Sequence, residues 1–172
     1  MVKRLQHRVL VGFISNLLVD LTRLVYSYGD DGIFYRYSGT KRIAAPWHGE
    51  LLKMKEKIEK EFVGDKFNYA LVNYYRDGTD YIGFHSDKEG DLVTGAAIAS
   101  VSLGAERDFI FTSNSTPKQK YTVLLENGSL LFMRGNTQKN YKHSVPKSKV
   151  VLREPRINIT FRRIDLKAIN KK

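Results

Sequence analysis

His85, Ser86 and Asp87 form an H-x-D triplet, and His143 follows 56 positions after Asp87. Two imidazoles and one carboxylate can occupy one face of an octahedral Fe(II) ion and leave the opposite face open to small ligands. On a strand, the i, i+2 spacing of His85 and Asp87 points both side chains to the same side of the sheet. A distant histidine on a neighbouring strand could then complete the set. The pattern therefore predicts a metal centre, although a bare H-x-D triplet also occurs by chance and a lone histidine is more often structural.

A second candidate for chemistry is the C-terminal stretch R-I-N-I-T-F-R, residues 156–162. It alternates polar and apolar residues, which predicts a strand with one buried face. Arg156 and Arg162 share the polar side with Asn158 and Thr160. Arginines inside a sheet need anions to offset their desolvation, and the planar guanidinium fits a carboxylate. The strand therefore indicates a site for a dicarboxylic acid whose two ends use the two arginines; the alternative is the solvated polar face of an edge strand.

These two features lie within a longer series of ordered motifs. The series consists of NYYRDGTDYIGFHSDKE at 73–89, IASVSLGA and RDF at 98–105 and 107–109, NGSLL at 127–131, and HSVP at 143–146, before the arginine strand. It resembles the core of the AlkB-type Fe(II)/2-oxoglutarate dioxygenases, and most of all the eukaryotic AlkB homologues that repair alkylated DNA. The resemblance covers roughly residues 28–164, and several motifs in order are far more specific than any one of them.

The resemblance implies a role for each matching residue. His85, Asp87 and His143 would hold Fe(II) and form the catalytic centre, with 2-oxoglutarate and O2 as cosubstrates. Arg156 would pair with the distal carboxylate of 2-oxoglutarate and Arg162 with the carboxylate beside the metal. The full expected set around the cosubstrate is Asn73, Tyr75, Arg156, Asn158, Thr160 and Arg162.

The implied reaction is oxidative demethylation of DNA or RNA carrying N-alkyl lesions of the 1-methyladenine or 3-methylcytosine type. The target base must be flipped out or already unpaired, and an aromatic side chain would stack on it. Tyr35 and Tyr37 are the candidates, because FYRYSG (residues 34–39) resembles the substrate lid of the family. Glu89 is expected to accept a hydrogen bond from an exocyclic amine. Without the resemblance, an alternative interpretation is as good: Tyr35 and Tyr37 would be ordinary aromatic residues of a half-buried strand, and Glu89 would be a surface acid.

The chain is basic and has no cysteine. Its formal charge is +11, and the segment from residue 139 to the end holds 11 Lys and Arg against only Glu154 and Asp165. Such a concentration of positive charge favours nucleic acid through counterion release, although it can also serve solubility alone. The lack of cysteine excludes disulfides and thiolate zinc sites and fits a reducing compartment. We expect a monomer with no membrane association, intracellular rather than secreted, in the nucleus or another DNA-containing compartment.

The N-terminal region is expected to be helical. The apolar stretch from Val9 to Val19 follows basic residues as in a signal peptide, but it lacks a small-residue cleavage pattern and is too short to span a bilayer. An amphipathic helix is predicted instead from about Ser15 to Tyr26, because five apolar residues fall near helical spacing: Leu17, Leu18, Leu21, Leu24 and Val25.

The rest of the chain predicts one more helix and a series of strands. The helix should begin at Pro46, a residue favoured in the first helical turn, and end near Phe62. Asn127-Gly128 predicts a hairpin between strands Tyr121–Leu125 and Ser129–Met133, because both residues tolerate positive φ. Further strands are expected at residues 33–37, 67–75, 96–103, 108–112 and 157–163.

Two helices followed by many strands indicate an α+β protein. The resemblance implies a double-stranded β-helix (jelly-roll) core with N-terminal helices packed on one side. At 172 residues the chain can bury a core without disulfides. We expect one dioxygenase domain over residues 1–172, made of a helical extension (1–27), a family-like core (28–164) and a basic tail (165–172).

Substrate preference and function leave alternatives. The family member that works on duplex DNA inserts an apolar finger from a hairpin before the lid strand. Here the segment before Tyr28-Gly29 is short and is expected to lack that hairpin, and we also expect no longer N-terminal arm for recruiting a replication clamp. We therefore expect single-stranded or locally melted substrate. The competing functions are the same chemistry on a protein or lipid, and a catalytically silent module that binds damaged nucleic acid.

Overall fold

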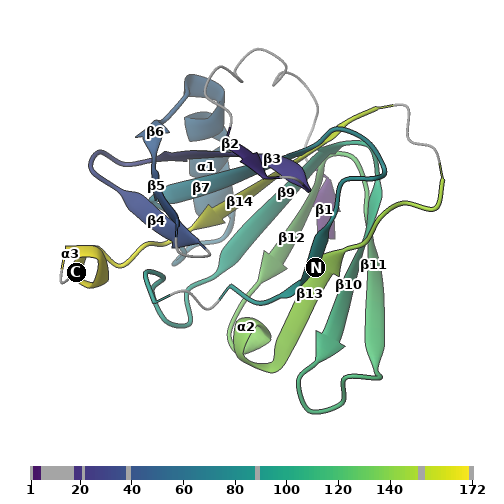
Figure 1. The fold of residues 1–172 in the computed structure, drawn as a ribbon. Coiled ribbons are helices and arrows are strands. Elements are labelled where there is room, and N and C mark those ends of the chain that lie inside the picture. Colours follow the sequence, from purple (N-terminus) through teal and green to yellow (C-terminus); the bar gives the residue numbers. More distant parts are fainter. Residues whose placement is uncertain are drawn as a thin grey trace.

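The computed structural model describes residues 2–4, 18–20, 22–37, 40–87, 90–150 and 154–170, and two sheets dominate it (Figure 1). The major sheet has the order β1 (Val2–Arg4), β12 (Ser129–Met133), β9 (Ile98–Gly104), β14 (Arg156–Arg162), β7 (Tyr69–Tyr75), β3 (Arg23–Gly29) and β2 (Leu18–Asp20), with β6 (Ala45–Pro46) beside β3. The minor sheet has the order β11 (Lys120–Leu125), β10 (Arg107–Ser113), β13 (Tyr141–Val145) and β8 (Ile82–His85). A separate hairpin joins β4 (Phe34–Tyr37) to β5 (Thr40–Ile43).

Apolar side chains from both sheets meet between them. One cluster takes residues from the major sheet and the minor sheet alike: Tyr75, Ile98, Phe109, Leu125, Leu131, Met133 and Val145. Each strand contributes alternate residues to this layer, as the pleat requires. Two antiparallel sheets packed face to face confirm the expected jelly-roll core within an α+β fold.

The helix α1 (Gly49–Glu61) covers the outer face of the major sheet (Figure 1). Its Leu51 and Ile58 lie two turns apart and are both buried against Ile159 and Phe161 of β14. The expected helix is therefore confirmed, but it begins three residues later than predicted because Pro46 pairs with β3 in β6. Burial of two large aliphatic side chains gives about 3–6 kcal/mol toward docking the helix.

The arginine strand β14 differs from the prediction in its surroundings. It is neither at an edge nor buried on one face only, since it lies between β9 and β7 and nearly every residue in it is buried. Ile159 and Phe161 face α1, whereas the polar residues face the space between the sheets. The polar side of the alternation is therefore an interior wall, and the edge-strand alternative is wrong.

The predicted helix from Ser15 to Tyr26 is wrong over its described residues. Leu18–Asp20 and Arg23–Gly29 form the antiparallel strands β2 and β3 instead. Burial in β3 alternates strictly, with Arg23, Val25 and Ser27 buried, because β3 pairs along its length with β7. Pairing with a neighbouring strand outweighs helical spacing that was only approximate. A hairpin therefore does precede the lid strand, contrary to the expectation.

The predicted hairpin around Asn127-Gly128 is also wrong. β11 pairs with β10 in the minor sheet, whereas β12 pairs with β9 and β1 in the major sheet. Gly128 does adopt a positive φ of 73°, and its N–H donates to the Ser102 carbonyl while the Asn127 side chain accepts from the Gly104 N–H. The turn is thus bound to β9 and carries the chain from one sheet to the other.

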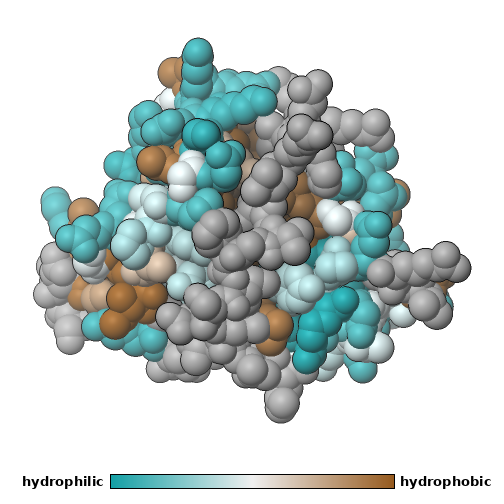
Figure 2. Space-filling model, turned by 90° about the horizontal axis from the view of Figure 1, so that it is seen from above, coloured by the Kyte–Doolittle hydropathy of each residue, from teal (hydrophilic) through white to brown (hydrophobic). Residues whose placement is uncertain are grey.

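The expected basic tail begins with a short helix, α3 (Leu166–Asn170), whose Ile169 is buried. Ile169 packs with Tyr35, Tyr69 and Ile164 in a cluster beneath the β4–β5 hairpin. No helix in the described ranges is long and apolar enough to cross a membrane. Viewed from above, much of the described surface is hydrophilic with small, separate hydrophobic areas (Figure 2).

Candidate metal centre and cosubstrate cavity

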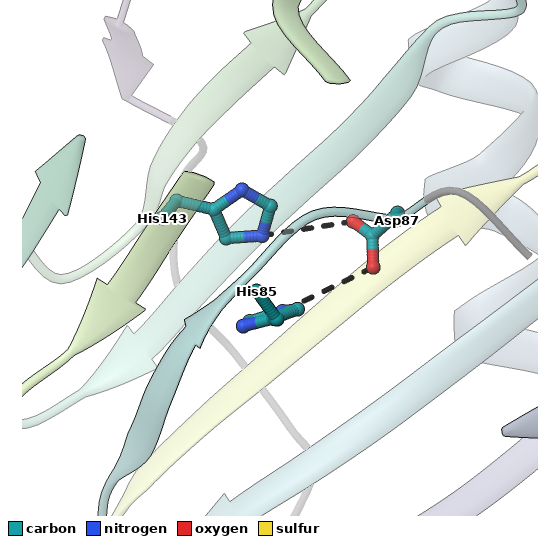
Figure 3. Close-up of side chains that lie close together, drawn as sticks. All are labelled: His85, Asp87 and His143. Atoms are coloured by element: carbon teal, nitrogen blue, oxygen red, sulfur yellow. Dashed lines mark ion pairs between the residues drawn. The ribbon is translucent and has the colours of Figure 1, made fainter. Parts of the chain in front are cut away.

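The three predicted metal ligands come together at the β13–β8 edge of the minor sheet, and Figure 3 shows their side chains close to one another. His85 ends β8 and faces His143 directly across the β8–β13 pair, while Asp87 lies two residues beyond His85. His85 Nε2 is 4.0 Å from Asp87 Oδ1, and His143 Nε2 is 3.7 Å from Asp87 Oδ2. One ligand atom from each residue lies within 4.8 Å of the other two. Two nitrogens and one oxygen so placed suit a divalent transition metal with open positions.

Different contacts orient the two histidines. His85 Nδ1 is 2.9 Å from the Gly83 carbonyl, which makes Nδ1 the protonated nitrogen and leaves the Nε2 lone pair toward Asp87. The His143 ring instead stacks on Phe109, with centroids 5.1 Å apart and planes 20° apart. A hydrogen bond therefore orients one ligand and packing orients the other.

Burial and charge prepare the ligands for a metal ion. Burial by itself would raise the pKa of Asp87, yet Arg162, His143 and His85 together hold it below its ordinary value. Arg162 Nη2 donates to Asp87 Oδ1 at 3.1 Å. Burial lowers the pKa of His143 to about 4, against the opposing attraction of Asp87. At neutral pH the carboxylate is therefore charged and the imidazole is neutral, as metal binding requires.

A narrow polar cavity lies between the sheets beside these ligands. Its walls include the metal ligands and, from the expected cosubstrate set, Asn73, Tyr75, Asn158, Thr160 and Arg162. The volume open to the centres of water molecules is only about 30 Å³, so the cavity is narrow. We expect a five-carbon dicarboxylate to displace side chains along its walls.

Arg156 lies behind Tyr75 instead of on the cavity wall. Its guanidinium is over the Tyr75 ring at 5.1 Å, and Nη2 donates to Ser102 Oγ at 2.9 Å. The side chain is 1% exposed, and its Nε and Nη1 are buried without hydrogen-bond partners in the described part of the chain. Burial lowers the pKa of Arg156, because the cation is desolvated. Such unpaired donors are costly unless an anion binds them, so Arg156 fits the far carboxylate of a dicarboxylic acid.

Asn73 has a fixed orientation that the sequence does not reveal. Arg23 Nε donates to Asn73 Oδ1 at 2.8 Å. Because a guanidinium has no acceptor, the atom of Asn73 that faces it must be the oxygen. The amide nitrogen then remains as a donor on a residue that lines the cavity, which suits an anionic ligand. Sequence reasoning missed Arg23, which shares one side of β3 with Val25 and Ser27; no pattern in the sequence marks it.

The other polar residues of β14 use their donors inside the protein. Asn158 Nδ2 donates to Ser100 Oγ at 2.8 Å and to the Val101 carbonyl, and Thr160 Oγ1 donates to the Leu71 carbonyl at 3.2 Å. Arg162 bonds Asp87 and also Tyr35. These residues line the cavity, but their present bonds bind strands together and hold a metal ligand.

The expected substrate residues are not brought together as a stacking platform. Tyr35 is fully buried, and its hydroxyl accepts a hydrogen bond from Arg162 Nη1 at 2.7 Å. Its ring lies 5.3 Å from Tyr69, so no face of it is open to a base. The Tyr37 side chain and Glu89 lie outside the described residues.

Gln138 is a second residue that sequence reasoning missed, and no pattern in the chain marks it. It lies in the short helix α2 (Thr137–Asn140), and its Oε1 accepts from the Asp87 N–H at 2.9 Å. The segment that leads into His143 therefore holds the backbone of Asp87. The two parts of the metal centre, far apart in sequence, are joined by this bond as well as by the β8–β13 pair.

Comparison with known proteins agrees with this arrangement. The family model of the 2OG-Fe(II) oxygenase superfamily matches residues 20–162. The chain is 43% identical over 145 residues to DNA oxidative demethylase ALKBH2 of Mus musculus, a match that covers 80% of this chain and 60% of that protein. The corresponding human protein is 41% identical, with 80% and 55% covered. Alpha-ketoglutarate-dependent dioxygenase alkB homolog 3 of Bos taurus is 39% identical over 162 residues, with 89% and 55% covered.

These matches confirm the AlkB-type resemblance. The chain spans little more than half the length of the relatives it matches. Among solved structures, that of OsALKBH1 superimposes with a TM-score of 0.55 at 22% identity and covers 83% of this chain and 79% of that one. That likeness concerns the fold alone, and it agrees with the jelly-roll core.

Proposed function

Because the chain belongs to the 2OG-Fe(II) oxygenase superfamily, we propose that it removes N-alkyl groups oxidatively from nucleic acid. The observation that carries this proposal is the convergence of His85, Asp87 and His143 beside a cavity backed by Arg156, whose Nε and Nη1 have no partner among the described residues. A module that only binds nucleic acid has no use for a metal-ready triad next to a buried, anion-seeking arginine.

The residues divide the work between metal and cosubstrate. His85, Asp87 and His143 would hold Fe(II), which together with 2-oxoglutarate and O2 supplies the oxidising power to hydroxylate an N-alkyl carbon. Arg162 keeps Asp87 ionised, and burial keeps His143 neutral at neutral pH, so both can bind a metal ion. Gln138 and the Phe109 ring restrain Asp87 and His143, which preserves the spacing of the ligands.

The cosubstrate would lie along β7 and β14. Arg156 would neutralise its far carboxylate, with Tyr75 beside the guanidinium. Asn73 would donate its amide N–H to the bound acid, because Arg23 occupies the amide oxygen. Arg162 would meet the end nearest the metal, and Asn158 and Thr160 would shape the wall between. Entry of the acid enlarges a cavity of about 30 Å³, so we expect cosubstrate binding to shift side chains of this wall.

Alkylated nucleic acid is the substrate that agrees with charge and with the relatives' names. The formal charge of +11 favours a polyanion, and the matched proteins are named for DNA oxidative demethylation. A base must leave its stack to reach a metal between two sheets. Tyr37 and Glu89 remain the predicted contacts to such a base. Tyr35 would not contact the base but would hold Arg162 in position through its hydroxyl.

The decisive experiment loads the protein with Fe(II) and 2-oxoglutarate without oxygen, then admits air and analyses a panel of methylated oligonucleotides by mass spectrometry. We expect loss of one methyl group per 2-oxoglutarate consumed, and no loss with His143→Ala. Turnover of 2-oxoglutarate without any demethylated oligonucleotide would indicate another substrate class. No iron-dependent turnover at all would indicate a silent binding module.

The preference for single-stranded or melted substrate stays a prediction, now without its first argument, because a β2–β3 hairpin precedes the lid strand. Turnover of one lesion in single and double strands tests it, and equal or faster repair of the duplex would refute it. We also keep the expectations of a monomer and of an intracellular, DNA-containing compartment. Sedimentation of the purified protein and fractionation of its cells test these two.

A further inference from the structure

A second cavity, which we name the loop cavity, lies between the loop that leads into β9 and the segment that leads into β13. It is lined mainly by residues 92–98 and by residues of the segment 135–139, with Arg163 beside them. In Figure 1 the loop before β9 and the helix α2 lie side by side. The volume is about 480 Å³, within the range of small-molecule sites. The loop cavity is therefore large enough for a ligand of nucleotide size.

The loop cavity adjoins the metal centre. Asp87 lines both this cavity and the narrow cosubstrate cavity. Gln138, which accepts from the Asp87 N–H at 2.9 Å, also lines the loop cavity. Gly90 is a further wall residue, and it directly follows Glu89, the predicted contact to the target base. A group in the loop cavity is therefore a close neighbour of a group at the metal.

Positive charge predominates on the walls of the loop cavity. The charged residues that line it, within the described ranges, are Asp87, Lys139 and Arg163. The Asp87 carboxylate is bound to Arg162, whereas Lys139 and Arg163 are both exposed, and Arg163 makes no ion pair with the described part of the chain. Asp91 belongs to the same loop, but it is 2% exposed and is not a wall residue. The walls therefore favour an anionic ligand.

The remaining wall of the loop cavity is apolar and leaves free space. A Cβ atom placed on Gly95 or Gly135 would meet no other atom within 4 Å. The apolar side chains of the wall are those of Leu92, Val93, Ala97 and Ile98. A wall of this kind suits a flat uncharged group, and the two cations suit phosphates. Inorganic phosphate would leave the apolar wall unused, whereas a nucleotide uses both parts.

We infer that the loop cavity binds a nucleotide of the substrate strand that neighbours the alkylated one. Its base would lie on the apolar wall, and its flanking phosphates would meet Lys139 and Arg163. This inference rests on the proposed nucleic-acid substrate and adds a second nucleotide to the binding site. A free nucleotide has the same chemistry but only one phosphate group, so a strand should bind more tightly.

The first test removes charge. Arg163→Gln is compared with Arg163→Lys, which keeps the charge, and with Lys57→Gln, which removes an exposed cation of α1 on the outer side of the major sheet. Fluorescence anisotropy at several salt concentrations measures the affinity of the metal-free protein for an unmodified single-stranded pentanucleotide. We expect Arg163→Gln to weaken binding about 10-fold and to reduce the salt dependence of log K by about 0.7. Arg163→Lys and Lys57→Gln should change both quantities little.

The second test fills the cavity and keeps its charges. Ala96 is a half-buried wall residue of the loop before β9, so Ala96→Leu adds bulk there without removing a cation. We expect this variant to weaken pentanucleotide binding as Arg163→Gln does. Unchanged affinity in Ala96→Leu, or equal losses in Arg163→Gln and Lys57→Gln, would overturn the inference, because the strand would then respond to overall charge and not to the cavity.

Competition identifies the source of the ligand. The pentanucleotide should resist displacement by AMP or inorganic phosphate at equal concentration. If AMP competes as well as an unlabelled pentanucleotide, the site is one for a free nucleotide and the inference is wrong; equal competition by phosphate would reduce it to a simple anion site. Weaker binding in Arg163→Gln and Ala96→Leu, with no demethylation by the unaltered protein, would support the loop cavity and refute the proposed function alone.

Discussion

The two faces of β14 are both buried, yet they have different roles. Ile159 and Phe161 on one face are fully buried in an apolar cluster with Leu51 and Ile58 of α1. Arg156 and Arg162 on the other face are equally buried, but among polar groups and a metal ligand. Burial of the apolar face stabilises the fold, whereas burial of a guanidinium costs free energy unless its donors find an anion or other acceptors. The difference teaches that equal burial marks stability on one face and ligand binding on the other.

The largest effect on activity should come from a substitution in the metal centre, on the side of the polar face of β14. His143→Ala should abolish iron-dependent turnover, by at least about 100-fold, since even the partners of metal ligands are worth 10–100-fold. The fold should remain, because the substitution removes one ring and leaves the backbone pairing of β13 with β10 and β8 intact. Coupled 2-oxoglutarate consumption and iron binding by equilibrium dialysis measure the loss. Normal iron binding in this variant would exclude the proposed centre.

Phe161→Ala probes the apolar face. Removal of this ring, which packs near Phe67 and Trp47, should lower the free energy of unfolding by about 3–5 kcal/mol. KM for 2-oxoglutarate should not change in the protein that remains folded. Urea unfolding measures the first quantity and steady-state kinetics the second. A large change in KM with little loss of stability would show that the two faces are not separate in function.

Arg156→Met should have the reverse pattern. Loss of the guanidinium should raise KM for 2-oxoglutarate by roughly 30-fold or more, as for one partner of a buried charge pair. The free energy of unfolding should stay equal or rise, because two buried donors that have no partner in the described part of the chain are removed.

Arg107→Met is the matched control for Arg156→Met. Arg107 lies over the same Tyr75 ring, but it donates to the carbonyls of Asp77, Asp80 and Pro146. We expect this variant to lose stability, because it leaves those carbonyls without a donor. Equal destabilisation by the two substitutions would mean that Arg156 is a structural cation and not an anion receptor.

Acid should weaken the metal-free protein through the same polar region. The pKa of His143 falls from 6.5 to about 4 on folding, so between these values the unfolded chain binds a proton that the folded chain does not. Stability therefore falls as the pH drops from 6.5 toward 4, by on the order of 3 kcal/mol. Asp87, whose pKa is lowered, adds loss in the same direction at lower pH. Urea unfolding at several pH values should show this slope, and His143→Gln should flatten it.

The smallest effect should come from Tyr35→Phe, which removes only the hydroxyl that Arg162 bonds at 2.7 Å. Loss of one buried bond to a charged donor should cost about 1.5–3 kcal/mol of stability. Arg162 also holds Asp87, so iron affinity should fall slightly as well. Tyr69→Phe, at the neighbouring ring, serves as the control because it removes a hydroxyl that bonds Ser27. Equal iron affinity in Tyr35→Phe and the unaltered protein would confine Tyr35 to a structural role.

The sequence by itself determined the chemistry that is available. The types and spacing of His85, Asp87 and His143 imply a metal set, and the alternation of β14 places its arginines on one side. The jelly-roll expectation also came from the order of motifs. Such features depend on residue type and on the period of a strand, both of which are local.

Only the tertiary structure decided which strands pair and what each face meets. Residues 23–29 form a strand because they pair with β7. Asn127-Gly128 connects the two sheets because β12 pairs with β9 and not with β11. Tertiary packing also buries Tyr35 and brings Arg23 to the Asn73 side chain, which fixes the orientation of that amide. It brings the Gln138 side chain to the backbone N–H of Asp87 as well. Contacts between residues 50 or more positions apart depend on the whole chain's packing, so no local pattern can reveal them.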